Sequence, residues 1–220
     1  MSLHLKRDME SLKKEILQLG DRVETAISNA ILILNERRVE LADNVFEEEK
    51  VINEKEVNIE ENCLKILALH QPVAVDLRFI VVVLKVNNDL ERMGDLAVNV
   101  AQRAVFLSNQ EPIEWPSAFA DTMSQSIRTM VQCSLNSLVQ LDVDLAGKVI
   151  AMDSEVDDIN RRMYAQMRVL MERDNANIER AVALLSTSRY LERIADLATN
   201  IAEDVIFMVE GEVVRHQNLS

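Results

Sequence analysis

The chain is short of the residues that turn a polypeptide, with only four glycines and three prolines among 220 residues. A sheet protein must reverse direction often and uses such residues at its turns, so their scarcity argues against a β-rich fold. Aromatic residues make up 4% of the sequence, whereas methionine occurs ten times. Cores of this composition are typical of helices packed on helices. We therefore predict an all-α protein with long helices.

Several familiar catalytic patterns are also missing. The glycines are scattered and cannot form a glycine-rich phosphate loop, a nucleophile elbow or a dinucleotide fingerprint. None of the three histidines, His4, His70 and His216, follows a glutamate by three residues, so the Glu-x-x-His pairs of di-iron bundles are absent. We expect these histidines at the surface or at helix ends, and we do not expect an enzyme.

The charge balance excludes another class of partner, because 37 acidic residues outnumber 24 basic ones and give a net charge of −13. Nucleic acid is bound through a basic patch, and here the basic residues are scattered. The longest purely apolar run, residues 79–84, is far shorter than the roughly 18 residues that cross a bilayer. The chain also begins without a signal-peptide pattern. We expect a soluble, cytoplasmic protein with Cys63 and Cys133 as buried, reduced thiols.

The most informative feature present is an internal repeat. Residues 90–101, LERMGDLAVNVA, return as LERIADLATNIA at residues 191–202, with eight identical positions and four similar ones. A weaker match relates residues 41–53 to residues 145–157. Each copy spans roughly 105 residues, longer than the repeat of a typical helical solenoid. The sequence therefore predicts duplication of a complete small bundle.

Breaks in the sequence divide each copy into three helices. Gln71-Pro72 separates two of them, because proline disfavours helical geometry in the residue before it. Residues 109–116 contain two prolines and mark the boundary between a first bundle, residues 1–109, and a second, residues 116–220. Helices of ~30 residues reach about 45 Å, so we expect a flattened, elongated molecule. The six predicted helices are 4–35, 38–69, 73–108, 117–141, 144–173 and 176–210.

The third helix of each copy has two distinct faces. At about 100° per residue, Met93 and Ala97 fall on an apolar side, and Glu91, Asp95 and Asn99 form a stripe nearly opposite. The second copy repeats this stripe with Glu192, Asp196 and Asn200. We expect the apolar side to pack and the oxygen-bearing stripe to face solvent.

Oxygen-bearing side chains four residues apart recur at four places. Like charges at this spacing repel mildly, and a hard cation such as Mg, Ca, Mn or ferric iron would offset the repulsion. The amide oxygens of Asn99 and Asn200 are further candidate ligands. The pairs are Glu49 with Asn53, Glu91 with Asp95, Asp153 with Asp157, and Glu192 with Asp196.

Other interpretations of these pairs stay open from the sequence alone. Acid pairs are common on solvated helices of an acidic chain, and Arg92 and Arg193 could bond acids of neighbouring helices. A metal-dependent oxidase or hydrolase could use the same carboxylates, but it would need a sheltered open coordination position. A passive helical scaffold would need only the helices and would tolerate the loss of every pair.

The two Glu-Arg-x-x-Asp motifs at residues 91–95 and 192–196, with HQPVAVDLR at residues 70–78, resemble the PhoU family. The similarity extends to the opening residues 4–15 and the closing residues 210–216. It implies two tandem three-helix bundles in a homodimeric, cytoplasmic accessory protein of phosphate transport. Such a protein would link the nucleotide-binding subunit of a phosphate ABC transporter to a sensor histidine kinase and restrain phosphate-starvation signalling, without catalysing a reaction.

The same resemblance implies surface iron or zinc clusters held through E(D)xxxD motifs, which correspond to the four pairs above. Asn53 departs from this pattern, because an amide stands where the motif has an acid. A neutral amide holds a cation less tightly than a carboxylate does. We therefore expect the site in the first half to be weaker or empty.

Overall fold

The computed structural model describes residues 3–115 and 119–211, which form six long helices and no strand. Two short 3₁₀ turns, at Val39–Leu41 and Asn175–Asn177, and a π-helical turn at Phe119–Met123 complete the regular structure. The all-α prediction is therefore confirmed. The helices are α1 Leu3–Glu36, α2 Ala42–His70, α3 Ala74–Ser108, α4 Ser124–Gln140, α5 Val143–Arg173 and α6 Ile178–Glu210.

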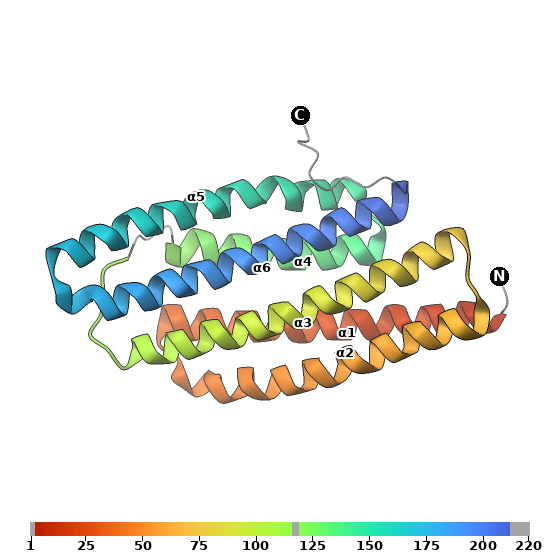
Figure 1. Cartoon of the computed structure of the whole chain (residues 1–220), viewed down its shortest axis with the longest axis horizontal. Helices are drawn as coiled ribbons and strands as arrows, with labels where there is room; N and C mark the ends of the chain where they lie inside the picture. Colours follow the sequence, from red (N-terminus) through yellow and green to blue (C-terminus); the bar gives the residue numbers. More distant parts are fainter. Residues whose placement is uncertain (1–2, 116–118, 212–220) are drawn as a thin grey trace.

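The helices lie along one long axis and give an elongated molecule (Figure 1). Helices α1, α2 and α3 pack on one another, and so do α4, α5 and α6. The two groups meet where α3 packs on α6 and, less extensively, where α1 packs on α4. Among the described residues, no helix is long and apolar enough to span a bilayer.

Helix ends lie close to the predicted breaks. After α2, Gln71 takes a left-handed conformation with φ of 46° before Pro72, and α3 begins at Ala74. Asp142 caps the start of α5 by accepting a hydrogen bond of 2.9 Å from the backbone N–H of Leu145. The predicted start of the fourth helix, residue 117, lies outside the described residues. A π-helical turn begins at Phe119 and leads into α4 at Ser124.

The core is a continuous set of aliphatic and methionine side chains. Met93 and Ala97 of α3 are fully buried, as predicted. Within the apolar run at residues 79–84, Ile80, Val82 and Val83 are buried and Val81 is exposed. This run therefore packs mainly inside the molecule.

The two cysteines are free thiols in different environments. Cys63 is buried, and burial, helped by the negative charges of Glu15 and Glu60, raises the pKa of its thiol to about 12. Such a thiol is inert as a nucleophile near neutral pH. The prediction that Cys133 is also buried is wrong, because its position on α4 leaves it half-buried.

Two of the three histidines lie near helix ends as predicted. His4 is exposed in the first turn of α1. His70, the last residue of α2, lies with its Nε2 atom 3.0 Å from Oδ2 of Asp8. This contact ties the end of α2 to α1. His216 lies outside the described residues.

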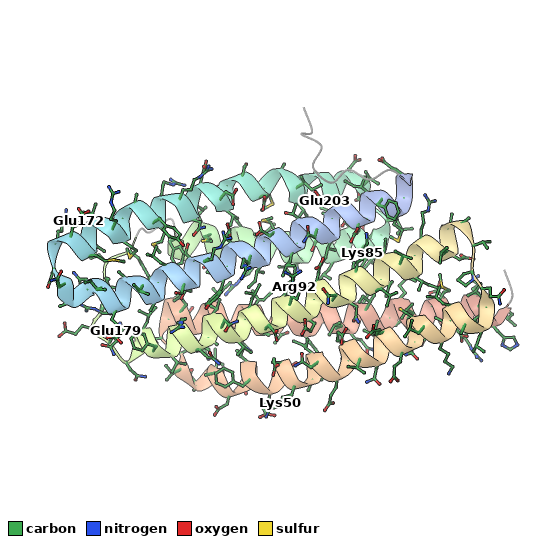
Figure 2. The ribbon with its side chains drawn as sticks, in the orientation of Figure 1. Lys50, Lys85, Arg92, Glu172, Glu179 and Glu203 are labelled. Atoms are coloured by element: carbon green, nitrogen blue, oxygen red, sulfur yellow. The ribbon has the colours of Figure 1, made fainter. Side chains whose placement is uncertain are left out.

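An ion pair between a half-exposed lysine and a buried carboxylate joins the two halves across α3 and α6. Nζ of Lys85 on α3 lies 2.8 Å from Oδ1 of Asp204 on α6, whose side chain is 2% exposed. The same ammonium lies 5.4 Å from the centre of the Phe207 ring. Figure 2 shows Lys85 reaching from α3 toward α6. A carboxylate this deeply buried requires a compensating charge, so the lysine is important for the interface.

We predict that Lys85→Met lowers the free energy of unfolding by about 2 kcal/mol, because it removes the ammonium that compensates the charge of the buried Asp204 carboxylate. Adding Asp204→Leu should recover at least half of the loss, since an apolar pair can replace a buried ion pair. Urea denaturation of both variants measures the effect. A double variant less stable than Lys85→Met would contradict this account.

Candidate functional site

Each predicted acid pair lies beside a pair on the neighbouring helix of the same half. In the second half, Asp153 and Asp157 on α5 lie near Glu192 and Asp196 on α6, and we call these four residues the α5–α6 acidic cluster. The hydroxyl of Thr199 donates a hydrogen bond of 3.4 Å to Oδ1 of Asp153. The cluster thus combines the i, i+4 pairs of two adjacent helices.

Burial and mutual repulsion make the charged state of this cluster unfavourable. Burial, followed by the negative charges of Asp196 and Asp157, raises the pKa of Asp153 to about 6. Burial is also the largest cause that raises the pKa of Glu192 and of Asp196. A bound cation would lower all three pKa values, because it favours the ionised carboxylates.

The expectation that these stripes face solvent is wrong for Glu192. This residue is only 8% exposed, because the stripe of α6 packs toward α5. One carboxylate oxygen accepts a hydrogen bond from Arg189, and the other, Oε2, is buried with no hydrogen-bond partner. Asp196 is exposed, whereas Asp153 and Asp157 are half-buried. The cluster therefore runs from the interior to the surface.

The first half has an analogous but weaker α2–α3 acidic cluster, formed by Glu49, Asn53, Glu91 and Asp95. Burial raises the pKa of Glu91, helped by the charge of Asp95, and burial together with Glu49 raises that of Asp95. Nδ2 of Asn53 donates a hydrogen bond of 2.6 Å to Oε1 of Glu49. Glu49 is thus already partnered by an amide, while Oδ1 of Asn53 is buried with no hydrogen-bond partner.

A groove of about 440 Å³ separates the two clusters, along the line where α3 meets α6. Asn99 and Asn200 line it together with Asp95 and Asp196, so the two predicted amides share a surface with the outer acid of each cluster. Two arginines of the sequence motifs, Arg92 and Arg193, and a third arginine, Arg189, complete the polar lining. Figure 2 labels Arg92 on α3 near the centre of the molecule.

One of the two motif arginines, Arg92, pairs with an acid of its own helix. Its NH1 atom lies 3.7 Å from Oδ1 of Asp89. Arg189, which sequence reasoning missed, pairs with Glu192 of its own helix. Its position three residues before Glu192 was the available signal. Thr199 and Glu203 were also missed as neighbours of Asp153.

The donor chemistry of the α5–α6 acidic cluster fits a hard cation, since all of its side chains offer carboxylate oxygens. The unpartnered, buried Oε2 of Glu192 agrees with this fit. In the part of the chain that is described, no three His, Cys, Asp or Glu side chains converge closely enough to hold a metal ion as they stand. Cation binding at the cluster therefore requires side-chain rotation.

These features define a class of all-helical proteins with two related three-helix halves that carry paired acidic faces. The sequence model of the PhoU domain matches residues 16–104 and 120–205, one match in each half. The chain belongs to the PhoU family, which confirms the resemblance seen in the repeated motifs.

Relatives are similar over nearly the whole chain. A phosphate-specific transport system accessory protein PhoU homolog from Aquifex aeolicus is 39% identical over 99% of this chain and 98% of its own length. The Escherichia coli accessory protein PhoU is 30% identical over 95% of this chain and 86% of its own length. The crystal structure of PhoU from Pseudomonas aeruginosa has a TM-score of 0.91 at 35% identity, covering 94% of this chain and 99% of that one.

We predict that Asp153→Asn stabilises the metal-free protein at pH 7.5. The pKa of this carboxyl is about 6 in the folded protein and 3.8 in the reference state. Its ionised form therefore destabilises the folded protein fully above pH 6, and this destabilisation diminishes as the pH falls. For a half-exposed group, screening reduces the expected gain to about 1 kcal/mol.

The gain should fall to about a third of that value at pH 4.5, because the folded carboxyl is then mostly protonated. Urea denaturation in the presence of a chelator measures both values. Glu61→Gln, which neutralises an exposed acid on α2, is the control and should change little. A gain for Asp153→Asn that does not depend on pH would refute the electrostatic explanation.

Proposed function

We propose that this chain is a cytoplasmic regulator of phosphate uptake and of phosphate-starvation signalling. It acts by protein–protein contact between the nucleotide-binding subunit of a phosphate ABC transporter and a sensor histidine kinase, and it catalyses no reaction. The observation that carries the proposal is the match, over 99% of the chain, to a relative described as a phosphate-specific transport system accessory protein. A homodimer is the proposed assembly.

The shape and surface of the molecule support a role in contact. Long helices offer extended faces and grooves, and partner proteins commonly recognise such surfaces. A regulator of this kind works because it binds one state of the transporter or kinase better than another, which shifts the population toward that state. The free energy that shifts the transporter or kinase between its states therefore comes from the difference in binding affinity for those states.

Cation binding at the two acidic clusters is part of the proposal. In each cluster, neighbouring carboxylates raise one another's pKa, so a cation would relieve repulsion within the bundle. The candidate ions are Mg, Ca, Mn, Zn and iron. The α5–α6 acidic cluster is the stronger candidate, because it has four carboxylates, whereas Asn53 replaces one in the first half and already bonds Glu49.

We predict that Mn²⁺ raises the Tm of the protein by about 4 °C at tenfold excess over its dissociation constant. Asp196→Asn should remove most of this rise, and Asp95→Asn, its counterpart 101 residues earlier, should remove less. Differential scanning calorimetry with and without chelator measures the shifts. Equal losses in the two variants, or no shift with any candidate ion, would refute the assignment to the second half.

We predict that Glu192→Gln with Asp196→Asn raises phosphate-starvation output in phosphate-rich medium. An increase on the order of fivefold corresponds to a coupling free energy of about 1 kcal/mol. A reporter gene under phosphate control, in a host that lacks its own copy of this protein, measures the output.

The matched control for this experiment is Asp158→Asn with Glu172→Gln, which neutralises two exposed acids on α5. It should leave the output unchanged at equal protein abundance. A passive helical scaffold predicts no change in either variant, so an unaltered reporter would refute the regulator in favour of the scaffold.

A further inference from the structure

The two halves differ in the position of one acid on their second helix. Residues of α2 correspond to residues of α5 at an offset of 104, so Asn53 matches Asp157 and Glu56 matches Asn160. An acid and an amide have therefore exchanged places between the halves. Residues three apart lie on one face of a helix, about one turn from each other. With Glu56 counted, this face of the first half has four carboxylates, as many as the α5–α6 acidic cluster.

In the second half, the inner of these two positions is neutral and fully bonded. The hydroxyl of Ser188 on α6 donates a hydrogen bond of 2.6 Å to Oδ1 of Asn160 on α5. Both residues are buried. Because neither side chain is charged, this contact between α5 and α6 requires no counter-ion.

In the first half, a carboxylate and an amide meet at the same place. Ser188 corresponds to Asn87 of α3 at an offset of 101. Nδ2 of Asn87 donates hydrogen bonds of 2.9 Å to the carbonyl oxygen of Glu56 and of 3.3 Å to its Oε1 atom. Asn87 is 1% exposed, and its Oδ1 atom finds no hydrogen-bond partner among the described residues. A buried acceptor without a donor destabilises the fold, so this oxygen requires a ligand.

Glu56 also places negative charge beside Glu91. Burial, followed by the charge of Glu60, raises the pKa of Glu56. Burial and the charge of Asp95, followed by that of Glu56, raise the pKa of Glu91. Glu91 comes four residues after Asn87 and shares its face of α3. Two half-buried carboxylates thus repel each other next to an amide oxygen that has no donor.

A second buried amide oxygen lies on the same face of α2. Asn53 comes three residues before Glu56, and its Oδ1 atom also lacks a hydrogen-bond partner in the described part of the chain. Burial is the main cause of the raised pKa values of Glu192 and Asp196, and the charge of Asp157, the counterpart of Asn53, contributes to both. By the repeat, Asn53 therefore lies against α3.

We propose that the first half binds a Ca²⁺ ion between the carboxylates of Glu56 and Glu91, with Oδ1 of Asn87 as a third ligand. Oδ1 of Asn53 is the fourth protein ligand, and water fills the remaining positions. Glu56 and Asn87 lie outside the E(D)xxxD motifs. The site is thus displaced by about one helical turn from the position that the motif defines.

The set of ligands favours Ca²⁺ over other cations. Two carboxylates neutralise a divalent ion, and amide carbonyl oxygens are common ligands of Ca²⁺. Ca²⁺ accepts about six to eight oxygens in flexible geometry, which suits side chains from two separate helices. Mg²⁺ demands a nearly ideal octahedron at shorter distances and gives up its water reluctantly.

This site extends the cation binding proposed above, but it rests neither on the four motif pairs as a set nor on the regulation of phosphate uptake. The Mn²⁺ prediction is measured through Asp196 of the second half, whereas the Ca²⁺ site is measured through Asn87 of the first. Each prediction can therefore fail while the other stands.

The test uses the full chain labelled with ¹⁵N in its asparagine side chains, after a chelator has removed bound metal. Asn87→Ser, which copies the second half, assigns the Asn87 amide signals. We expect these signals to shift on titration with CaCl₂, with a Kd on the order of 10⁻⁴ M. MgCl₂ should bind at least about tenfold more weakly. The side chain of Asn109, exposed at the end of α3, should not shift.

Single variants locate the ion. Glu56→Gln should weaken Ca²⁺ binding at least about tenfold, because it removes one of the two carboxylates. Glu54→Gln removes an exposed acid two residues earlier on α2 and is the matched control, with a change of less than about twofold. No shift of the Asn87 signals with CaCl₂ would overturn the proposal. So would a loss in Asp95→Asn as large as that in Glu56→Gln, because the ion would then lie at the motif position.

A double variant tests the displacement without changing the charge. Asn53→Asp with Glu56→Asn gives α2 the residues of α5 and leaves the net charge and the composition as they are. We expect the Asn87 signals to lose their response to CaCl₂. Attraction of cations by the overall negative charge predicts no such loss, so an unaltered response would overturn the proposal. This variant and Glu56→Gln test the same ligand independently of each other.

Two alternatives for the Asn87 oxygen predict different results. If a proton on Glu56 bonds it, the Asn87 signals will follow the pH and will not respond to CaCl₂. If an ordered water bonds it, the signals will respond to neither. Either result would overturn the assignment to a cation.

Discussion

The packing of α3 on α6 is the constraint on which the rest of the structure depends. These two helices carry the repeated motif, and their contact joins the halves and includes the ion pair of Lys85 with the buried Asp204. The stripe on each helix lies beside this contact, so its acids approach those of α2 or α5 while its asparagine and outer acid line the groove between α3 and α6. The acidic clusters and the central groove both follow from this arrangement.

The acidic clusters are costly to the fold, and this makes them informative. Asp153 has a pKa of about 6 because it is partly removed from water and faces other carboxylates. Packing alone would favour an apolar or oppositely charged residue at such a place. Strain of this kind, kept in a protein of otherwise regular helices, is typical of surfaces that serve binding. This cost is the reason for the proposal that the clusters bind cations.

The sequence predicted the helices well and the site less well. Helix breaks depend on local features, such as Gln71-Pro72, so they could be found without tertiary structure. The burial of Glu192 could not be predicted in this way, because it results from the packing of α5 on α6. The sequence of α6 alone does not show where α5 packs. The pairing of Arg189 with Glu192 is local and could have been predicted from their spacing, but Arg189 lies outside the repeated motif.

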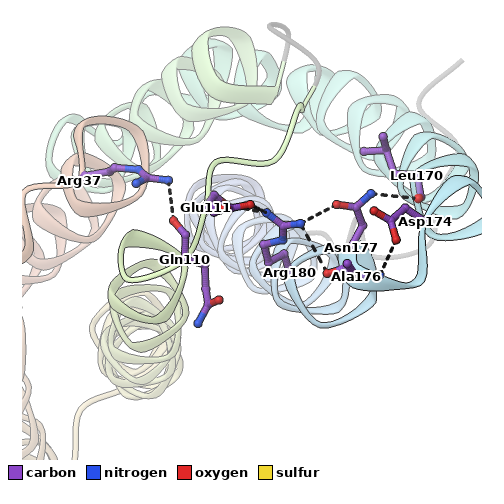
Figure 3. Close-up of polar contacts among 8 residues, drawn as sticks. All are labelled: Arg37, Gln110, Glu111, Leu170, Asp174, Ala176, Asn177 and Arg180. Carbon is purple, nitrogen blue, oxygen red and sulfur yellow. Dashed lines mark hydrogen bonds and ion pairs between the residues drawn. The ribbon is translucent and has the colours of Figure 1, made fainter.

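The sequence by itself determined the duplication, the all-helical class and the membership of a family, because these are written in residue spacing and composition. Only the tertiary structure decided which acids of neighbouring helices lie together, and it also decided that residues 109–115 are held at one end by Arg37 and Arg180 (Figure 3). The physical reason is that periodicity fixes which residues share a face of one helix. What that face meets depends on how separate helices pack, and side chains far apart in the chain decide it.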